Sequence, residues 1–576
     1  MSKMSKIEEQ KIAKEMIAEV FTGLSGKFQD YYEEQLIRWL SSHTILVHNG
    51  KGIYARKPFF LEPYNLISKH IDKLGLKNTK YNGRPEITEV CSKILDSLIK
   101  EFEQLIKPNP IGYLVCILTY LDRNVLATFA TMTWFHSMFR DGTEEKNEKY
   151  ELGVVISDTF SYMIDQEDKK FKDVFKGWES HLGLDKISFE MTLEIILDSL
   201  EGTESSSKEV DNVKALEYAR AIGDIIQSRD NVNNKIFVSQ SLSITENGTI
   251  EVDRIEDFEE KYNEFQRVNL HWLANKSEQR NISEDNLFRI NQVCEEHFGL
   301  KSEEFIEFAE ELLNFYNSTT WIISTQEKFP TTIKKFFNKD EVILKDFLSH
   351  LIRKPNEDND YLSVSKRIAR PLRKSLILYY KDWFICPCSV LYYSLLGLYN
   401  DVFDRNLDLD NTKLSAQLQK IYQDIDDDFE KDITAQLEAE FKTPVKHDTH
   451  KIYINDRDFI TPPGQIDILF FHDSTLFVIE CKNFPFKYNT QAIGNEVNKT
   501  KTAFTYKLKD KIEFVEQNID AVANLLELNR DDIEKVNGIF ITNNFSFAQV
   551  VGEVEYPVIN NTQVIEWFNK YNIQLL

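Results

Sequence analysis

The sequence predicts a multidomain α+β protein with a large, mainly helical N-terminal region and a C-terminal α/β module. Three observations lead to this fold class. At 576 residues the chain is too long for a single hydrophobic core. Apolar residues recur at helical spacing in residues 1–200. From about Leu414 the pattern changes to a helix, three strands, a helix and a strand, which is the order of a compact α/β module.

Residues 1–200 are expected to form a helical region. In "ITEVCSKILDSLIKEFEQLI", residues 87–106, apolar side chains recur every three or four positions, as they do on the buried face of an amphipathic helix. The Ser-rich stretch "EGTESSSKEVDN", residues 201–212, is typical of a surface loop. It marks a boundary to the next region.

Residues 213–410 are expected to form a mixed, mainly helical region with short hairpins. Asn247-Gly248 separates two alternating runs, which predicts a tight β-hairpin turn. A second hairpin is expected to turn at Lys381-Asp382 and to be followed by an apolar helix from Leu391 to Phe403.

Residues 414–576 are expected to form the α/β module. Its first helix is predicted over residues 424–441, because an acidic opening suits the positive end of a helix dipole. Period-two and period-3.6 patterns then predict the remaining elements in order. These are strands over 446–456, 464–471 and 475–484, helices over 491–504 and 518–528, strands over 536–544 and 557–560, and a helix over 562–571.

Charge restricts where a nucleic acid could bind. The formal net charge of the chain is −24, and an acidic body repels phosphates. Residues 441–511 differ, because they carry 11 Lys and Arg against 8 Asp and Glu. A nucleic-acid site is therefore expected in this part of the chain. No signal peptide or membrane-spanning segment is apparent, so we expect a cytoplasmic protein that does not enter a membrane.

Two acids fall within the apolar strands of the module. A symmetric turn at Asp473-Ser474 would place Asp467 directly opposite Glu480, on the same face of the hairpin. Facing carboxylates repel one another, and an apolar hairpin screens this repulsion poorly. The sequence therefore predicts a cation between them.

The same hairpin supplies the other groups that a catalytic metal site needs. Lys482 points to the same side as Glu480, while Cys481 offers its backbone carbonyl. Two carboxylates and a carbonyl are hard oxygen ligands of the kind that Mg²⁺ or Mn²⁺ prefers, with positions left for water and phosphate. The lysine can orient or deprotonate the attacking water, as metal-assisted phosphodiester hydrolysis requires.

The pattern of Asp467, twelve intervening residues and then Glu480-Cys481-Lys482 resembles the PD-(D/E)XK nuclease superfamily, and its Mrr-like and nuclease-related members most of all. This resemblance implies a restriction-endonuclease-like fold. It assigns Asp467 and Glu480 as catalytic metal ligands and Lys482 as the catalytic lysine. Family members often add an acid from the first helix, which we assign to Glu430, with Asp427 and Asp428 as alternatives.

Further residues follow from the helix after the hairpin. Gln491 matches the polar residue that related enzymes place at the start of this helix. The lysines in and before the helix are expected to contact a nucleic-acid backbone; they are Lys487, Lys499 and Lys501.

We therefore expect a divalent-metal-dependent DNA endonuclease, which the resemblance places in bacterial defence against foreign DNA. The N-terminal region would regulate or target it, and would bind a partner protein or a second copy of the chain. Two alternatives stay open. The module could be a degenerate nuclease fold that binds nucleic acid or acts as a scaffold, or it could cleave RNA, because the site chemistry does not distinguish the sugar.

Overall fold

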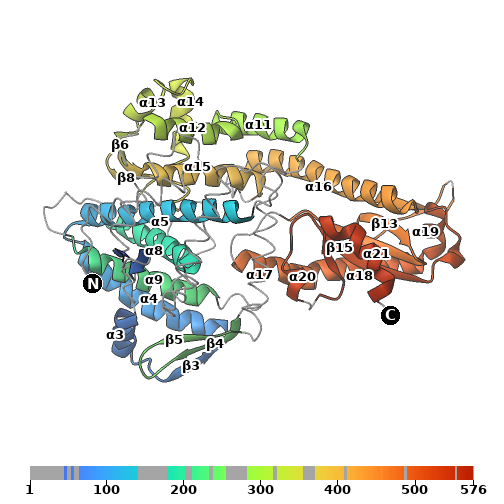
Figure 1. Cartoon of the computed structure of the whole chain (residues 1–576), viewed down its shortest axis with the longest axis horizontal. Coiled ribbons are helices and arrows are strands. Elements are labelled where there is room, and N and C mark those ends of the chain that lie inside the picture. The colour runs from blue at the N-terminus through green and yellow to red at the C-terminus, as the bar shows by residue number, and fades with distance from the viewer. Residues whose placement is uncertain are drawn as a thin grey trace. The chain divides into compact units, whose positions relative to one another are not determined.

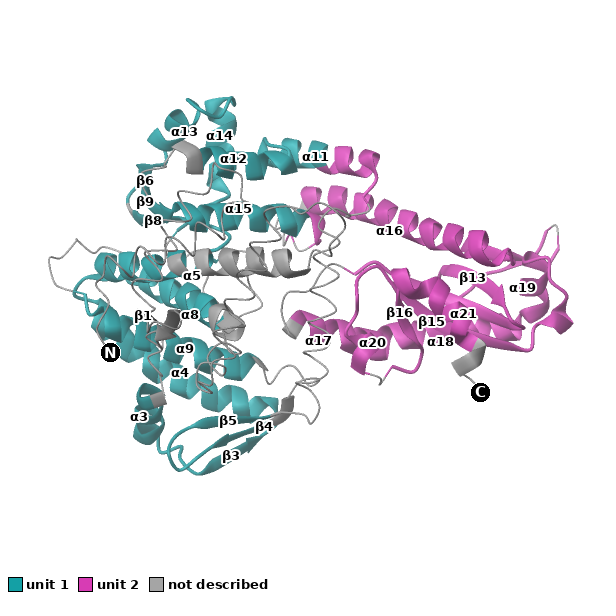
Figure 2. Cartoon of the chain, in the orientation of Figure 1, with its two compact units in different colours: residues 1–233, 238–253, 291–402 teal, residues 234–237, 254–290, 403–576 magenta. Residues whose placement is uncertain are grey.

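The computed structural model, drawn in Figure 1, divides the chain into two compact units, which Figure 2 shows in different colours. Unit 1 comprises Met1–Asn233, Val238–Asp253 and Asn291–Val402, and unit 2 comprises Asn234–Phe237, Arg254–Ile290 and Phe403–Leu576. The structure describes residues 45–48, 53–56, 64–139, 178–200, 210–231, 238–254, 282–315, 321–354, 370–405, 407, 412–455, 457–484, 490–551 and 554–574.

The helices of unit 1 bury apolar faces. The 87–106 pattern lies in α4 (Arg84–Ile106), whose buried residues include Ile87, Ile94, Leu98 and Phe102. The helical character predicted for residues 1–200 is thus found in the described part of that region. The unit's helices are α3 (Tyr64–Leu74), α4 (Arg84–Ile106), α5 (Pro110–Phe139), α8 (Trp178–Asp198), α9 (Asn212–Asn231), α11 (Glu284–Phe298, which continues from unit 2), α12 (Ser302–Phe315), α13 (Lys328–Ile333), α14 (Glu341–Ser349) and α15 (Cys388–Phe403).

Small sheets accompany these helices. Strands β4 (Val238–Ile244) and β5 (Ile250–Arg254) flank the predicted Asn247-Gly248 turn and join β3 (Thr79–Asn82) in one sheet. The predicted Lys381-Asp382 hairpin is also present, and it lies in the sheet β6-β9-β8-β7. The bounds are β1 (Ile45–His48), β2 (Ile53–Arg56), β6 (Trp321–Thr325), β7 (Ile352–Arg353), β8 (Leu376–Tyr380) and β9 (Trp383–Pro387).

Charged groups of unit 1 are paired both in the core and at the surface. Arg353, whose side chain is 1% exposed, donates from Nε to Glu194 Oε1 at 3.1 Å and from Nη2 to Oε2. Glu101 accepts hydrogen bonds from Tyr218, Lys69 and Lys73. Burial of Glu101 acts to raise its pKa, but these hydrogen bonds outweigh burial and lower the pKa to about 2.

Unit 2 is built on a five-stranded sheet with the order β10-β13-β14-β15-β16, in which β14, β15 and β16 are parallel. Two further short strands, β11 and β12, pair separately. The strands are β10 (Val445–Thr449), β11 (Ile452–Tyr453), β12 (Phe459–Ile460), β13 (Ile466–His472), β14 (Thr475–Lys482), β15 (Lys535–Thr542) and β16 (Val558–Asn560). The helices are α16 (Thr412–Phe441), α17 (Thr490–Lys499), the π-helical turn η1 (Thr500–Phe504), α18 (Thr505–Gln517), α19 (Ile519–Leu525), η2 (Arg530–Asp532), α20 (Ala548–Val551), η3 (Asn561–Gln563) and α21 (Val564–Gln574).

Helices cover both faces of this sheet. One apolar cluster joins α16 and α21 to β13–β15 through residues such as Ile433, Ile468 and Phe568. The other joins α17, α18 and α19 to the opposite face through residues such as Leu508 and Val478. Because both faces are covered, the central strands read as nearly continuous apolar runs, and an acid on them must find a partner inside the fold.

Three element boundaries differ from those predicted by more than a few residues. Helix α16 starts at Thr412, so the acidic run at 424–428 lies inside the helix. Three acids of this run contact side chains of unit 2 and do not cap the helix: Asp424 pairs with Arg289, Asp426 with Arg405, and Asp428 accepts a hydrogen bond from Asn286. The strand predicted over 446–456 ends at Thr449, and after a bend at His450 the chain continues into β11. The helix predicted over 491–504 continues through the π-helical turn to Gln517.

Candidate active site

The β13–β14 hairpin has the predicted register. Ile468 lies opposite Ile479 and His472 lies opposite Thr475, so continuing the register by one step places Asp467 opposite Glu480. Asp473 and Ser474 both have positive φ, at 47° and 56°. Two left-handed residues form a type I′ turn, whose twist matches that of the paired strands.

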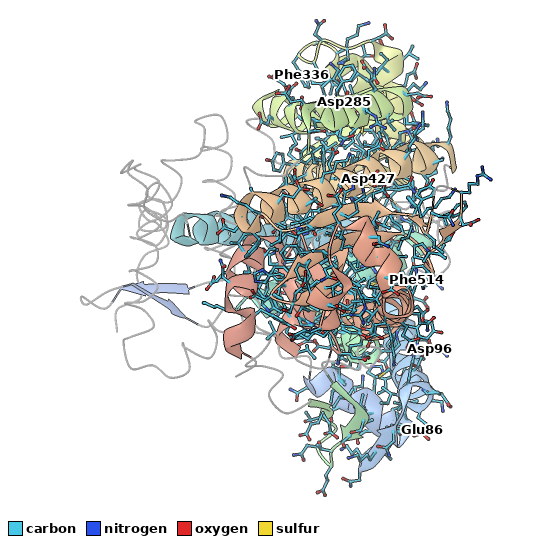
Figure 3. All side chains as sticks on the ribbon, turned by 90° about the vertical axis from the view of Figure 1, so that its right-hand side faces the viewer. Glu86, Asp96, Asp285, Phe336, Asp427 and Phe514 are labelled. Carbon is cyan, nitrogen blue, oxygen red and sulfur yellow. The ribbon has the colours of Figure 1, made fainter. Side chains whose placement is uncertain are left out.

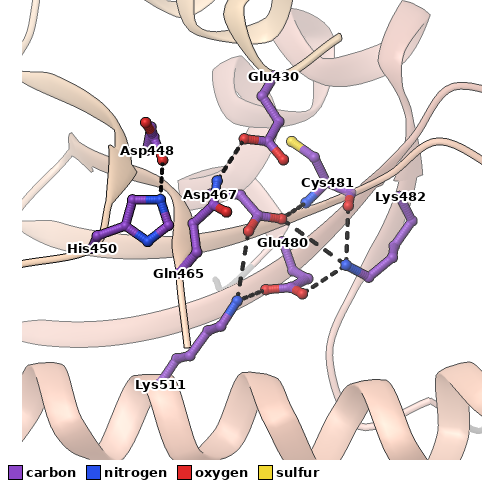
Figure 4. A network of polar contacts seen from close by, with 9 residues as sticks. All are labelled: Glu430, Asp448, His450, Gln465, Asp467, Glu480, Cys481, Lys482 and Lys511. Atoms are coloured by element: carbon purple, nitrogen blue, oxygen red, sulfur yellow. Dashed lines mark hydrogen bonds and ion pairs between the residues drawn. The ribbon is translucent and has the colours of Figure 1, made fainter. Parts of the chain in front are cut away.

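The two acids are buried and face one another, as Figure 4 shows. Asp467 is 7% exposed and Glu480 is 6% exposed. The backbone N–H of Cys481 donates to Asp467 Oδ2 at 2.8 Å. This bond ties the carboxylate of β13 to the end of β14 and fixes its direction.

The predicted cation between the acids is a lysine ammonium. Lys482 Nζ lies 2.6 Å from Glu480 Oε1, 3.1 Å from the Cys481 carbonyl oxygen and 4.0 Å from Asp467 Oδ2. It also lies 5.4 Å from the centre of the Phe504 ring, within cation–π range. The three groups predicted to ligate a metal therefore converge on one positive charge.

A second lysine, which the sequence reasoning missed, completes the cluster. Lys511 Nζ contacts Glu480 Oε2 and lies 3.6 Å from Asp467 Oδ1. Lys511 is on α18 and 5% exposed. A signal was present in the sequence: Lys511 falls three positions after Leu508 and four before Val515, which places it on the apolar face of the helix. A lysine there needs an internal acidic partner.

Glu430 approaches the cluster from α16. It is half-buried and accepts a hydrogen bond from Gln465 Nε2 at 3.3 Å. Burial and the Asp467 charge raise the pKa of Glu430 to about 8. The alternative Asp427, labelled in Figure 3, is exposed, and Asp428 accepts a hydrogen bond from Asn286 Nδ2 at 3.0 Å.

The charges of the cluster shift the pKa values of its members in opposite directions. Burial and the neighbouring Glu480 raise the pKa of Asp467 to about 6. Burial also acts to raise the pKa of Glu480, but the ammonium groups of Lys482 and Lys511 outweigh it and lower this pKa. Burial acts to lower the pKa of Lys482, and Glu480 and Asp467 reverse this and raise it. Glu480 and Lys482 are thus held in their charged forms.

The remaining predicted residues belong to the segment that follows the hairpin. Gln491 is in the first turn of α17, but its side chain lies outside the described residues, as does all of Lys487. Lys499 is exposed at the end of α17. Lys501 is half-buried in the π-helical turn.

The oxygen atoms of the cluster fit a hard divalent cation. One oxygen of Asp467, one of Glu480 and the Cys481 carbonyl already surround a cation, the Lys482 ammonium, and oxygen ligands are those that Mg²⁺ prefers. Within the described part of the chain, no three His, Cys, Asp or Glu side chains form a metal-binding group. A bound ion would therefore need water or substrate oxygens as additional ligands.

In the described ranges, no helix is long and apolar enough to span a bilayer.

Residues 426–543 match the nuclease-related domain family. Neither a curated protein nor a solved structure matches the chain. The family match begins inside α16 and ends just after β15, so it includes the acid–lysine cluster formed by Asp467, Glu480, Lys482 and Lys511. The C-terminal module therefore contains a match to the nuclease-related domain family, which is part of the restriction-endonuclease-like, PD-(D/E)XK group.

Proposed function

We propose that the module is a divalent-metal-dependent endonuclease that hydrolyses phosphodiester bonds in DNA. The observation that carries this proposal is the convergence of Asp467, Glu480 and the Cys481 carbonyl on one cationic position. The family match supports a nuclease-like function for the same residues. Metal-assisted attack on a phosphodiester uses oxygen ligands for the ion together with a group that activates water, and the cluster supplies both.

Each residue of the cluster has a distinct task in this reaction. Asp467, Glu480 and the Cys481 carbonyl would hold Mg²⁺ or Mn²⁺. When bound, the ion would act as a Lewis acid and offset the negative charge of the phosphate. Lys482 would leave its place between the acids, where the ion would take over its charge, and as the neutral amine it would orient the attacking water and accept its proton. Glu430 would support Asp467 from α16.

The surroundings of the cluster would bind the substrate. Lys487, Lys499 and Lys501 would contact backbone phosphates, and Gln491 would assist at the start of α17. This part of the chain is locally basic, with 11 Lys and Arg against 8 Asp and Glu in residues 441–511. Such phosphate contacts carry no sequence information. We therefore assign targeting or regulation to the N-terminal region or to a partner it binds, and place the activity in cytoplasmic defence against foreign DNA.

Cleavage of supercoiled plasmid, linear DNA and RNA by the full chain tests the reaction. The assay is run with Mg²⁺, with Mn²⁺ and with EDTA. Asp467→Asn is the most informative variant, because the asparagine amide oxygen can still accept the Cys481 N–H while the ligand charge is lost. An exposed acid of the same unit, changed in Asp531→Asn, is the matched control.

We expect metal-dependent DNA cleavage by the wild type and the control, and none by Asp467→Asn or Lys482→Ala. Equal cleavage by Asp467→Asn and the wild type would refute the assigned site. Cleavage of RNA alone would replace DNA as the substrate.

A non-catalytic nucleic-acid-binding module is the second candidate. It is favoured by the charge balance of the cluster, since two lysines already neutralise the two acids. A binding module of this kind would bind DNA in EDTA as tightly as in Mg²⁺, and Asp467→Asn would leave that affinity within about threefold of the wild type. Gel-shift titrations under both conditions separate it from the enzyme.

A further inference from the structure

The two carboxylates of the acid pair present two different edges. Lys482 occupies one edge, where it contacts Glu480 Oε1 and lies 4.0 Å from Asp467 Oδ2. Lys511 occupies the other, where it contacts Glu480 Oε2 and lies 3.6 Å from Asp467 Oδ1. Figure 4 shows the two ammonium groups reaching the acids from different elements, one from β14 and one from α18. The two edges are not equivalent.

The Lys482 edge is the more accessible and has the additional oxygen ligand. The Cys481 carbonyl lies on this edge, 3.1 Å from Lys482 Nζ. The Lys482 side chain is 19% exposed, whereas that of Lys511 is 6% exposed. A divalent ion that enters from solvent would therefore exchange with Lys482 more readily than with Lys511.

The packing of α18 holds Lys511 at the inner edge. Leu508, Ile512 and Val515 of the same helix face are buried against the sheet. The helix lies close to β15 because Gly538 has no side chain: a Cβ at this position would be 2.5 Å from Ile512 Cδ1. Lys511 is thus fixed by its own helix and does not depend on the hairpin that carries the acids.

We propose that Lys511 is a positioning residue that acts as a permanent counter-cation of the acid pair, and that a divalent ion takes the Lys482 edge while Lys511 stays in place. This inference rests on the proposed metal-dependent function. In the metal-free protein Lys511 would hold one oxygen of each carboxylate and keep the pair together. In the metal-bound protein the same ammonium would repel the ion and weaken its binding. Lys511 would therefore set the metal affinity without touching the substrate.

Lys511→Met tests this role, because methionine has a similar length and no charge. Removing a positive charge close to a divalent ion strengthens metal binding, and this outweighs the loss of order in two carboxylate side chains. We expect Lys511→Met to bind Mn²⁺ at least about tenfold more tightly than the wild type, measured from the free Mn²⁺ signal in electron paramagnetic resonance. Its thermal midpoint should be lower than that of the wild type in EDTA and should rise more with Mn²⁺.

Two variants serve as controls. Lys511→Arg retains the positive charge and should bind Mn²⁺ within about threefold of the wild type. Lys509→Met makes the same change at an exposed position of α18 and should behave as the wild type. Equal or weaker Mn²⁺ binding by Lys511→Met than by the wild type would overturn the role of Lys511 alone. Absence of Mn²⁺ binding from the wild type and all variants would instead overturn the metal-dependent function together with this inference.

A measurement on the wild type needs no variant and decides the matter if Lys511→Met does not fold. Lysine-directed labelling, read by mass spectrometry, is performed in EDTA and with Mn²⁺. We expect Mn²⁺ to increase the labelling of Lys482 by at least about threefold and to leave Lys511 protected. Increased labelling of Lys511 with unchanged Lys482 would show that the metal takes the inner edge, contrary to the proposal.

Discussion

The close approach of α18 to the sheet can be tested by adding one methyl group at Gly538. Gly538 lies in β15, and a Cβ there would be 2.5 Å from Ile512 Cδ1 and 3.0 Å from Leu508 Cδ2. Ordinary van der Waals contact begins at 3.4 Å, so the shorter distance must lengthen by about 0.9 Å. Gly538→Ala is therefore expected to displace the Ile512 and Leu508 side chains and to loosen the packing of α18 that holds Lys511 against Glu480.

The cost of this change can be worked out from competing effects. Overpacking of a well-packed core costs about 1–3 kcal/mol. Replacing glycine by alanine at a compatible backbone conformation returns about 0.4–1 kcal/mol through the unfolded state. A net loss of about 1–2 kcal/mol is expected. Ile512→Val removes the Cδ1 methyl group and alone lowers the free energy of unfolding by about 0.5–1.5 kcal/mol. In the double variant Gly538→Ala/Ile512→Val, however, the loss of this methyl group should relieve about 1 kcal/mol of the overpacking strain.

Hydrogen exchange read by mass spectrometry is the suitable assay, because it reports on each element of a two-unit chain separately. Peptides of α18 and β15 in Gly538→Ala should exchange about 5- to 30-fold faster than in the wild type, whereas peptides of α4 in unit 1 should be unchanged. The double variant should recover part of the protection. Additive effects of the two substitutions, within about 0.5 kcal/mol, would refute the proposed contact between Gly538 and Ile512.

Three further predictions concern charged groups. Arg353→Met leaves the buried Glu194 carboxylate without its bidentate partner and should destabilise unit 1 by about 3–5 kcal/mol in chemical denaturation; a loss below about 1 kcal/mol would contradict this. The folded-state pKa of Glu101 is about 2, below its ordinary 4.5, so its stabilising contribution is present above pH 4.5 and is lost as pH falls towards 2. Glu101→Gln should therefore lower the thermal midpoint at pH 7 but not at pH 2, and an equal decrease at both pH values would refute the assignment. Phe504→Leu removes the ring beside Lys482 and should cost about 0.5–2 kcal/mol in thermal unfolding, with an unchanged midpoint as the contrary result.

The hairpin of the site could be predicted from the sequence because its determinants are local. The turn at Asp473-Ser474 and the alternation along both strands fix the register, and the register alone brings Asp467 opposite Glu480. The need for a cation followed from electrostatics. Electrostatics alone could not predict that two lysine ammonium groups provide this positive charge. Lys511 lies 31 residues after Glu480 and reaches it only through the packing of α18.

The predicted boundaries that proved wrong, the start of α16 and the end of β10, also depend on contacts between residues far apart in the sequence. The start of α16 at Thr412 could not be inferred from its acidic run, because the partners that accommodate this run inside the helix include Arg289, far away in the sequence. The turn that ends β10 after Thr449 is set by the packing of Ile452 into the core of unit 2. Neither interaction has a local sequence signature.

The charge balance of the site leads to a last prediction, about metal removal. In a structural metal site the ion offsets the charge of its ligands, so that a chelator unfolds the protein. Here Lys482 and Lys511 offset the charges of Asp467 and Glu480 without any ion. EDTA should therefore abolish cleavage, while the hydrogen-exchange protection of β13 and β14 should stay within about twofold of that in Mg²⁺. Loss of protection in these strands on chelation would mean that the lysines do not stabilise the acid pair, and the metal would then have to be assigned a structural role.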